Sequence, residues 1–152
     1  MEIQETPVFI KPEGLRREKE IVLRIERFSH IAFLKWVELD ADMISVIYPY
    51  VSKSLWFATL EHLFKRKVLV MVLKGANIVP LAFDMIGKET NPEDCGLHTL
   101  RLELHRKEKL TPKLLADGST VYYWNYLHRA RTPEEAKVQI KALLNGSYHP
   151  SM

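Results

Sequence analysis

The chain has 152 residues, 47% of them hydrophobic and 27% charged, a composition typical of globular domains and not of disordered or fibrous proteins. Its 22 Lys and Arg against 19 Asp and Glu give a formal charge of +3, which does not by itself imply nucleic acid but suits a small anionic ligand. The single cysteine excludes an internal disulfide, and no apolar run is long enough to span a bilayer. We therefore expect one domain over residues 1–152.

Apolar patterning and turn signals predict the elements in chain order. Strands are favoured at residues 7–10, 31–39, 68–73 and 121–128. Helices are favoured at residues 17–28, 41–48, 54–65, 77–86 and 132–146. The continuous apolar run at 68–73 is typical of a strand buried on both faces. Asn77 is expected to cap the fourth helix, and the sequence Thr-Pro-Glu-Glu from Thr132 forms a capping box that begins the fifth.

Strands and helices alternate along this order, which indicates an α+β fold. Four strands and two main crossing helices fit a ferredoxin-like sandwich, with a four-stranded antiparallel sheet covered by helices. A parallel, doubly wound sheet is the alternative. The charged segment at about 103–119 contains Pro112 and Gly118 and fits no long element. We expect it to be an extra surface segment, with a short helix at 112–116.

Three sets of polar residues could carry chemistry. Lys11 enters the tight turn Lys-Pro-Glu-Gly at a strand end, where its ammonium can meet a phosphate oxygen, although a solvated loop lysine is the plainer interpretation. Asn125 and His128 interrupt an aromatic strand, and an imidazole there can act as a nucleophile or merely satisfy a hydrogen bond. Arg101 follows the segment Thr90-Asn91-Pro92 and could bind an anion or form a surface ion pair.

Two further interpretations are weaker. The aromatic residues at 122–126 could bind RNA, but neighbours on a strand face opposite sides, so core packing is favoured over nucleic acid. Cys95, His98 and His105 lie close in sequence, but their spacing is not that of a known zinc motif. We therefore expect no resident metal site. The first five residues lack the basic-then-apolar order of a signal peptide, and a cytoplasmic protein is expected.

Taken in order, these motifs resemble the nucleoside diphosphate kinase family over about residues 6–144. Phe9-Ile10-Lys11-Pro12-Glu13-Gly14 resembles the opening strand and turn of that family. Tyr48 with Trp56-Phe57 resembles its tyrosine followed by paired aromatics, and residues 70–77 resemble its third strand and helix entry. Residues 85–92 differ from the usual segment mainly by one insertion. Thr-Leu-Arg at 99–101 and Asn-x-x-His at 125–128 complete the set.

The resemblance implies transfer of the γ-phosphate of a nucleoside triphosphate to a nucleoside diphosphate through a phosphohistidine, with ping-pong kinetics. His128 matches the nucleophile of the family, and Lys11 and Arg101 match its phosphate-binding cations. The other nucleotide-binding positions it implies are Tyr48 near the nucleophile, Trp56 under the base, Leu60 beside it, Thr90 on phosphate and Asn125 on the sugar. Magnesium would accompany the nucleoside triphosphate, held by phosphate and water, and a homo-oligomer is expected.

Several positions depart from the family pattern. Arg129-Ala130-Arg131 replaces the Gly-Ser-Asp that usually follows the histidine, and Gln139 stands where a carboxylate normally orients the imidazole ring. Phe83 stands where a second phosphate-binding arginine is expected. The two new arginines disfavour a protonated imidazole, and they could serve as phosphate ligands or block the site. The competing hypothesis is therefore a weak or inactive relative that binds nucleotide or a protein partner.

Overall fold

The computed structural model describes residues 2–49, 51–118 and 121–149. Their elements follow in chain order: β1 (Ile3–Ile10), the 3-10 helix η1 (Pro12–Arg17), α1 (Glu18–Glu26), β2 (His30–Glu38), α2 (Ala41–Ile47), α3 (Lys53–Leu63), β3 (Lys67–Ala76), α4 (Ile78–Ile86), the 3-10 turn η2 (Pro92–Asp94), α5 (Leu100–Glu108), β4 (Lys113–Leu114), β5 (Val121–Tyr122), β6 (Leu127–Arg129) and α6 (Pro133–Leu144). Among these residues, no helix is long and apolar enough to cross a membrane.

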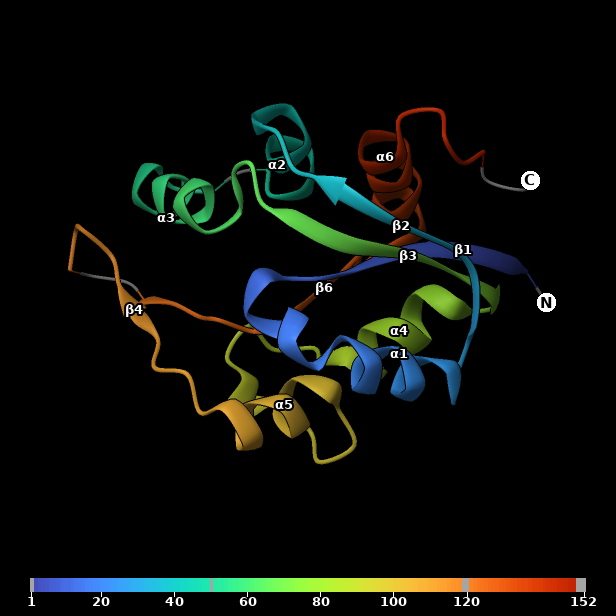
Figure 1. Cartoon of the computed structure of the whole chain (residues 1–152), viewed down its shortest axis with the longest axis horizontal. Coiled ribbons are helices and arrows are strands. Elements are labelled where there is room, and N and C mark those ends of the chain that lie inside the picture. Colours follow the sequence, from blue (N-terminus) through green and yellow to red (C-terminus); the bar gives the residue numbers. More distant parts are fainter. Residues whose placement is uncertain (1, 50, 119–120, 150–152) are drawn as a thin grey trace.

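Four of the strands form one sheet in the order β2-β3-β1-β6, and every neighbouring pair is antiparallel. This confirms the predicted four-stranded antiparallel sheet, and the parallel, doubly wound alternative is wrong. In Figure 1, α2 and α6 lie on one side of the sheet and α1 and α4 on the other. The short strand β6 is an edge strand, so its side chains lie at the border of the sheet.

Alternation along the strands builds a separate core on each face. On one face Val8 and Met71 pack with residues of α1, α4 and α5. On the other face Phe9 and Val70 pack with residues of α2, α3 and α6. The run 68–73 in β3 is buried throughout, which confirms the prediction of a strand covered on both sides.

Four of the six α-helices in the described part of the chain have a side-chain N-cap, and α1 and α4 do not. The side chains of Asp40, Ser52, Thr99 and Thr132 each accept a hydrogen bond from a backbone amide in the first turn of the helix that follows. The prediction that Asn77 caps α4 is wrong, because Asn77 adopts a left-handed conformation with φ of 53° and makes no capping bond. Instead Oε1 of Gln4, on β1, accepts from the amide of Val79 at 3.1 Å.

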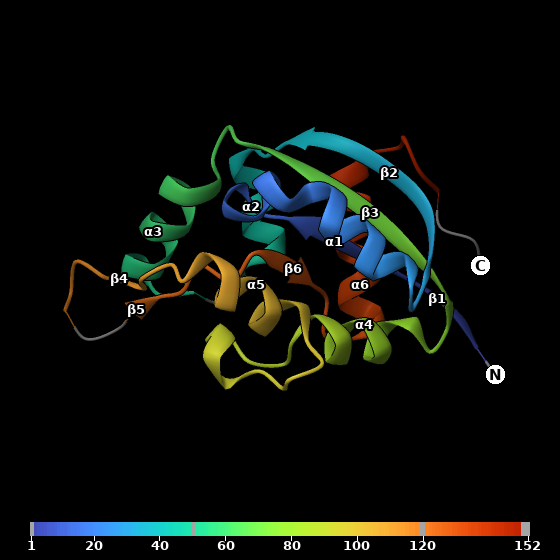
Figure 2. The ribbon, with the colours of Figure 1, turned by 60° about the horizontal axis from the view of Figure 1, so that its bottom comes forward.

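The segment between α5 and β6 differs most from the sequence expectations. Residues 103–108 belong to helix α5. The prediction of a helix at 112–116 is wrong, because Lys113–Leu114 pairs with β5 in a small hairpin. Ser119 lies outside the described residues. The strand expected at 121–128 is split, since Tyr126 has a left-handed backbone with φ of 72°. Figures 1 and 2 show the hairpin beside α3, at one end of the molecule.

Candidate active site

The sheet brings together residues that are far apart in the sequence. Lys11 directly follows β1, and its amide donates to the carbonyl of Tyr126 at 2.9 Å. His128 lies on β6 opposite Phe9 of β1. At Gly14 a Cβ would lie 2.9 Å from the same Tyr126 carbonyl, so only glycine allows the turn after Lys11 to pack this closely. The Lys-Pro-Glu-Gly turn is therefore fixed against the strand that carries the histidine.

A chain of hydrogen bonds fixes the ring of His128, which is only 6% exposed. Its Nε2 lies 2.8 Å from Oε1 of Gln139, and Nε2 of Gln139 donates to Oε1 of Glu135 at 3.2 Å. Because the Glu135 carboxylate accepts from the amide nitrogen, the amide oxygen faces the imidazole and accepts from its N–H. The imidazole therefore carries its proton on Nε2. Its Nδ1 keeps a lone pair and forms no hydrogen bond with another described residue.

Aromatic rings border the imidazole on two sides. Phe9 stacks on it with a centroid separation of 4.9 Å, and Tyr48 meets it edge-on at 5.5 Å. The ammonium of Lys11 lies 5.7 Å from the centroid of the Tyr48 ring. The Tyr48 hydroxyl is buried without a hydrogen-bond partner among the described residues. A buried hydroxyl beside a histidine and a lysine is available to a ligand.

Lys11 and Asn125 are joined directly. Nζ of Lys11 donates to Oδ1 of Asn125 at 2.6 Å, and Nδ2 of Asn125 donates to the backbone carbonyl of Thr90 at 3.0 Å. Both Lys11 and Asn125 are buried, whereas Thr90 is exposed. The segment before η2 is thus tied to the turn after β1 through one amide side chain.

Two guanidinium groups lie in the same region. Arg101 donates to the carbonyls of Gly87 at 3.3 Å, Glu89 at 2.9 Å and Leu127 at 2.8 Å, and its Nε is buried without a partner among the described residues. Arg129 donates to the carbonyls of Gly87 and Lys88, each at 3.0 Å. We call Lys11, Arg101 and Arg129 the basic cluster.

The basic cluster is buried, and burial dominates its electrostatics. Burial lowers the pKa of Lys11 to about 7, although the nearby Glu13 carboxylate opposes the shift. Burial, followed by repulsion from neighbouring arginines, lowers the pKa of Arg101 to about 9 and that of Arg129 to about 10. Burial also holds the pKa of His128 well below its usual value; the Gln139 bond opposes this shift and the three cations add to it. The imidazole is therefore neutral at pH 7.

The other predicted nucleotide-binding residues form no hydrogen bond with the basic cluster among the described residues. Trp56 and Leu60 are on α3 and pack, partly buried, against the core that contains Phe9 and Val70. Among the described residues, no hydrogen bond or ring contact joins either of them to the basic cluster. Thr90 contributes its carbonyl to Asn125, and its hydroxyl forms no hydrogen bond within the described part of the chain.

Sequence reasoning missed two parts of the arrangement. Glu135 was identified only as part of a capping box, but its carboxylate fixes the amide of Gln139, one helical turn later. Glu13 accepts from Nε2 of His62 at 2.5 Å and from the amide of Tyr126 at 3.1 Å, and Nδ1 of His62 lies 2.6 Å from the Tyr122 hydroxyl. The spacing of Glu135 and Gln139 on a helix could have revealed the first. No sequence signal links Glu13, His62 and Tyr122.

Cys95, His98 and His105 have separate partners. The thiol of Cys95 faces backbone carbonyls, His98 contacts Asp84, and His105 contacts Glu93 and the Tyr126 hydroxyl. Within residues 2–49, 51–118 and 121–149, no three His, Cys, Asp or Glu side chains are placed to hold a metal ion.

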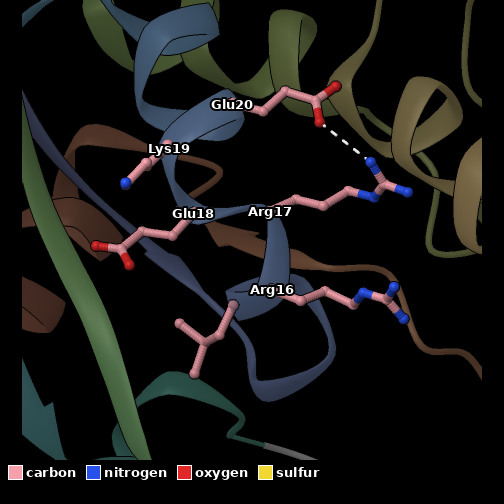
Figure 3. Close-up of a pocket in the computed structure, with 6 residues that line it drawn as sticks. Arg16, Arg17, Glu18, Lys19 and Glu20 are labelled. Carbon is pink, nitrogen blue, oxygen red and sulfur yellow. Dashed lines mark hydrogen bonds and ion pairs between the residues drawn. The ribbon is translucent and has the colours of Figure 1, made fainter.

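A surface hollow at the junction of η1 and α1 lies outside this site. It is lined by Leu15 and the charged residues 16–20, and Figure 3 shows Arg17 paired with Glu20. Arg17 also pairs with Glu108 of α5 at 2.6 Å. The Arg17–Glu108 ion pair attaches the first helical segment to α5, and the hollow presents charges of both signs.

The fold and the site together define an α+β domain with a neutral histidine beside buried cations. A family model for nucleoside diphosphate kinase matches residues 4–148. A nucleoside diphosphate kinase of Metallosphaera sedula is 34% identical over 108 residues, 68% of this chain and 76% of the relative. One of Methanocaldococcus jannaschii is 31% identical over 143 residues, 91% of each chain. The chain therefore belongs to the nucleoside diphosphate kinase family.

Solved structures agree on the fold. The apo nucleoside diphosphate kinase of Encephalitozoon cuniculi superposes with a TM-score of 0.74 at 24% identity, covering 98% of this chain and 94% of that one. The enzyme of Borrelia burgdorferi, solved as a transition-state mimic with vanadate and ADP, gives a TM-score of 0.72 at 18% identity, covering 92% and 86%. At these identities the likeness establishes the ferredoxin-like architecture of this family.

Proposed function

We propose that this chain is a phosphotransferase that moves the γ-phosphate of a nucleoside triphosphate to a nucleoside diphosphate through a phosphohistidine at His128. Family membership over residues 4–148 supports the reaction class. The observation that carries the assignment to His128 is its hydrogen-bond chain: Gln139 accepts from Nε2, so the lone pair of Nδ1 is available in a region of buried cations.

In the first half-reaction, Nδ1 of His128 attacks the γ-phosphorus. A nitrogen–phosphorus bond forms while the bond from that phosphorus to the β,γ-bridging oxygen breaks, and the nucleoside diphosphate leaves with the electron pair. In the second, a terminal oxygen of another nucleoside diphosphate attacks the same phosphorus, and the nitrogen–phosphorus bond breaks. The proton on Nε2 stays hydrogen-bonded to Gln139 throughout, so no general base is required.

Positioning and charge stabilisation supply most of the catalysis in phosphoryl transfer. Lys11 and Arg101 would bind phosphate oxygens, replacing the contacts with Asn125 and with backbone carbonyls that they make here. Tyr48 would offer its unpartnered hydroxyl beside the reacting atoms. Because these side chains are basic or neutral, magnesium is expected to arrive with the nucleotide, held by phosphate and water.

The remaining nucleotide contacts are proposed for side chains at the edge of the site. We assign the base to Trp56 and Leu60 on α3, the sugar hydroxyl to Asn125, and a phosphate oxygen to the hydroxyl of Thr90. Stacking on an aromatic ring tolerates any base, since every base has a π face. A nucleotide bound there would contact α3 and the segment before η2 at once.

The alternative of an inactive relative is less well supported. Arg129 directs its guanidinium onto Phe83 and the carbonyls of Gly87 and Lys88, which is not the placement of a side chain that covers the imidazole. Gln139 keeps the hydrogen-bond acceptor that the ring needs. We further propose a cytoplasmic protein that assembles as a homo-oligomer through exposed apolar residues of β2.

Steady-state kinetics test the proposal. When ATP is varied at several fixed GDP concentrations in the presence of magnesium, the account predicts parallel double-reciprocal plots. It also predicts loss of turnover when magnesium is chelated and in His128→Ala. Sequential kinetics, or an unchanged rate in His128→Ala, would contradict a phosphohistidine at this position.

A further inference from the structure

We propose that Arg129 is a catalytic residue of this protein, whose guanidinium binds an oxygen of the transferred phosphoryl group. Phe83 on α4 stands where a phosphate-binding arginine is expected, and Arg129 on β6 would supply the missing positive charge. This inference rests on the proposed function, because it assigns a ligand role within the same site.

The first observation is how firmly the guanidinium of Arg129 is positioned. Its Nε and Nη2 donate to the carbonyls of Gly87 and Lys88, each at 3.0 Å. Its carbon lies 4.4 Å from the centroid of the Phe83 ring, so the cation rests on an aromatic face. Nη1 forms no hydrogen bond with another described residue. A guanidinium that is fixed on one edge and unpaired on the other is prepared for an incoming acceptor.

The second observation is the absence of a counterion in the described part of the chain. Arg129 is only 6% exposed and Arg101 only 3%, yet neither forms an ion pair there. Both donate to the same carbonyl oxygen, that of Gly87, at 3.0 Å and 3.3 Å. Two buried guanidinium groups that converge on one oxygen repel each other, and removing them from water is costly unless an anion compensates. A phosphoryl group carries the required negative charge and accepts hydrogen bonds on each of its oxygens.

The third observation is the position of Phe83. This ring lies on α4, where the family resemblance places a phosphate-binding arginine, and the guanidinium of Arg129 covers its face. The carbonyls that hold Arg129 come from Gly87 and Lys88, in the segment that carries one inserted residue relative to the family. The ring and the altered loop thus form the support for an arginine that approaches from the neighbouring strand.

The test uses the full-length protein and compares Arg129→Gln with Arg131→Gln, which removes the same charge from an exposed side chain two residues away. Binding of the magnesium complex of a non-hydrolysable ATP analogue, which carries the γ-phosphate, is measured by calorimetry, and phosphate transfer from ATP by turnover. A lost charge-assisted hydrogen bond predicts about 10- to 100-fold weaker binding or slower transfer for Arg129→Gln, and a much smaller change for Arg131→Gln. Circular dichroism checks that each variant is folded.

A second variant keeps the proposal testable if Arg129→Gln is unstable. Adding Phe83→Arg to Arg129→Gln returns a guanidinium to the same spot from α4, and we expect it to recover most of the lost transfer. Equal losses in Arg129→Gln and Arg131→Gln, or no recovery in the double variant, would overturn the role of Arg129 and leave the proposed function intact. If the parent protein transfers no phosphate, the proposed function fails, and titration with the non-hydrolysable ATP analogue still decides whether Arg129 binds the γ-phosphate.

Discussion

At the scale of single residues, the imidazole of His128 is controlled by a neutral amide. The side-chain oxygen of Gln139 accepts a hydrogen bond from the protonated Nε2 of His128. The Glu135 carboxylate accepts from the Gln139 amide nitrogen, which prevents the amide group from rotating by 180°. A carboxylate in direct contact would favour a charged imidazole, whereas an amide fixes the ring and its tautomer without adding charge. The sequence change from carboxylate to Gln139 therefore preserves the geometry of the nucleophile.

Replacing Gln139 with leucine tests whether Gln139 positions the imidazole of His128. The variant removes the acceptor of a buried N–H while keeping a similar volume, and we expect kcat to fall about 10- to 100-fold, in proportion to the loss of a buried hydrogen bond. Nitrogen-15 NMR of the histidine should show the Nε2–H tautomer in the parent and a mixture in the variant. Gln139→Glu, which keeps an acceptor, is the control. A parent-like tautomer and rate in Gln139→Leu would contradict the positioning role.

The lowered pKa of Lys11 predicts how nucleotide binding depends on pH. Below about pH 7 the ammonium of Lys11 is already charged in the free protein, so Lys11 adds no pH dependence to binding. Above about pH 7, Lys11 must take up a proton when a phosphate binds. Because the second ionisation of a phosphate monoester has a pKa of about 6 and is nearly complete by about pH 7.5, Kd for a nucleoside diphosphate should rise up to about tenfold per pH unit between about pH 7.5 and 9. Calorimetry at several pH values measures this. The Lys11→Arg variant should lose most of this pH dependence of Kd. A Kd that does not change with pH in the parent protein would contradict the lowered pKa of Lys11.

At the scale of elements, the β4–β5 hairpin is held on α3 by a polar network with an apolar contact beside it. Leu115 and Tyr122 pack on Ala58, and the Tyr122 hydroxyl pairs with Nδ1 of His62. His62 in turn bonds to Glu13 in the turn after Lys11. The hairpin is thus connected to the strand end that carries the candidate site.

Removing the hydroxyl of Tyr122 should weaken this attachment. Tyr122→Phe leaves Nδ1 of the buried His62 without a partner, and we expect a loss of about 1–3 kcal/mol in the free energy of unfolding. Tyr123→Phe makes the same chemical change at a partly exposed position and should stay within about 0.5 kcal/mol of the parent. Urea unfolding measures both. Equal stability of the two variants would mean that the network does not hold the hairpin.

The elements also show what the sequence could and could not predict. The apolar run in β3 and the Thr132 cap with Pro133 before α6 encode their structures locally, and the predicted buried strand and helix start are both confirmed. The β4–β5 hairpin was not predicted because its two-residue strands are stabilised by packing on α3. The break at Tyr126 was not predicted because it depends on a left-handed backbone, which hydrophobic periodicity does not encode. Motif order identified the residues that converge at His128. The orientation of Arg129 follows from Gly87, Lys88 and Phe83, which only the folded chain brings together.

At the scale of the whole molecule, the two edges of the sheet differ. The edge strand β6 carries the candidate nucleophile, whereas the opposite edge strand β2 exposes Leu34 and Trp36 on one face, each 46% accessible. Apolar side chains on an exposed edge strand favour pairing with another chain. This is the surface through which we expect copies of the protein to associate.

Light scattering with size-exclusion chromatography tests that expectation. We predict an oligomer for the parent and a shift to monomer in Trp36→Glu, which places a charge beside Leu34 on the exposed apolar part of β2. Leu97→Glu, at an exposed apolar residue in the loop before α5, should keep the parental mass. A monomeric parent, or an oligomer that persists in Trp36→Glu, would exclude association through β2.

The most direct test of the account is the transfer of label from γ-labelled ATP to the protein itself. The account predicts one labelled phosphoryl group per chain, labile to acid and stable to base, attached to Nδ1 of His128, and released as labelled nucleoside triphosphate when GDP is added. Absence of label in the parent, or label that persists in His128→Ala, would contradict it.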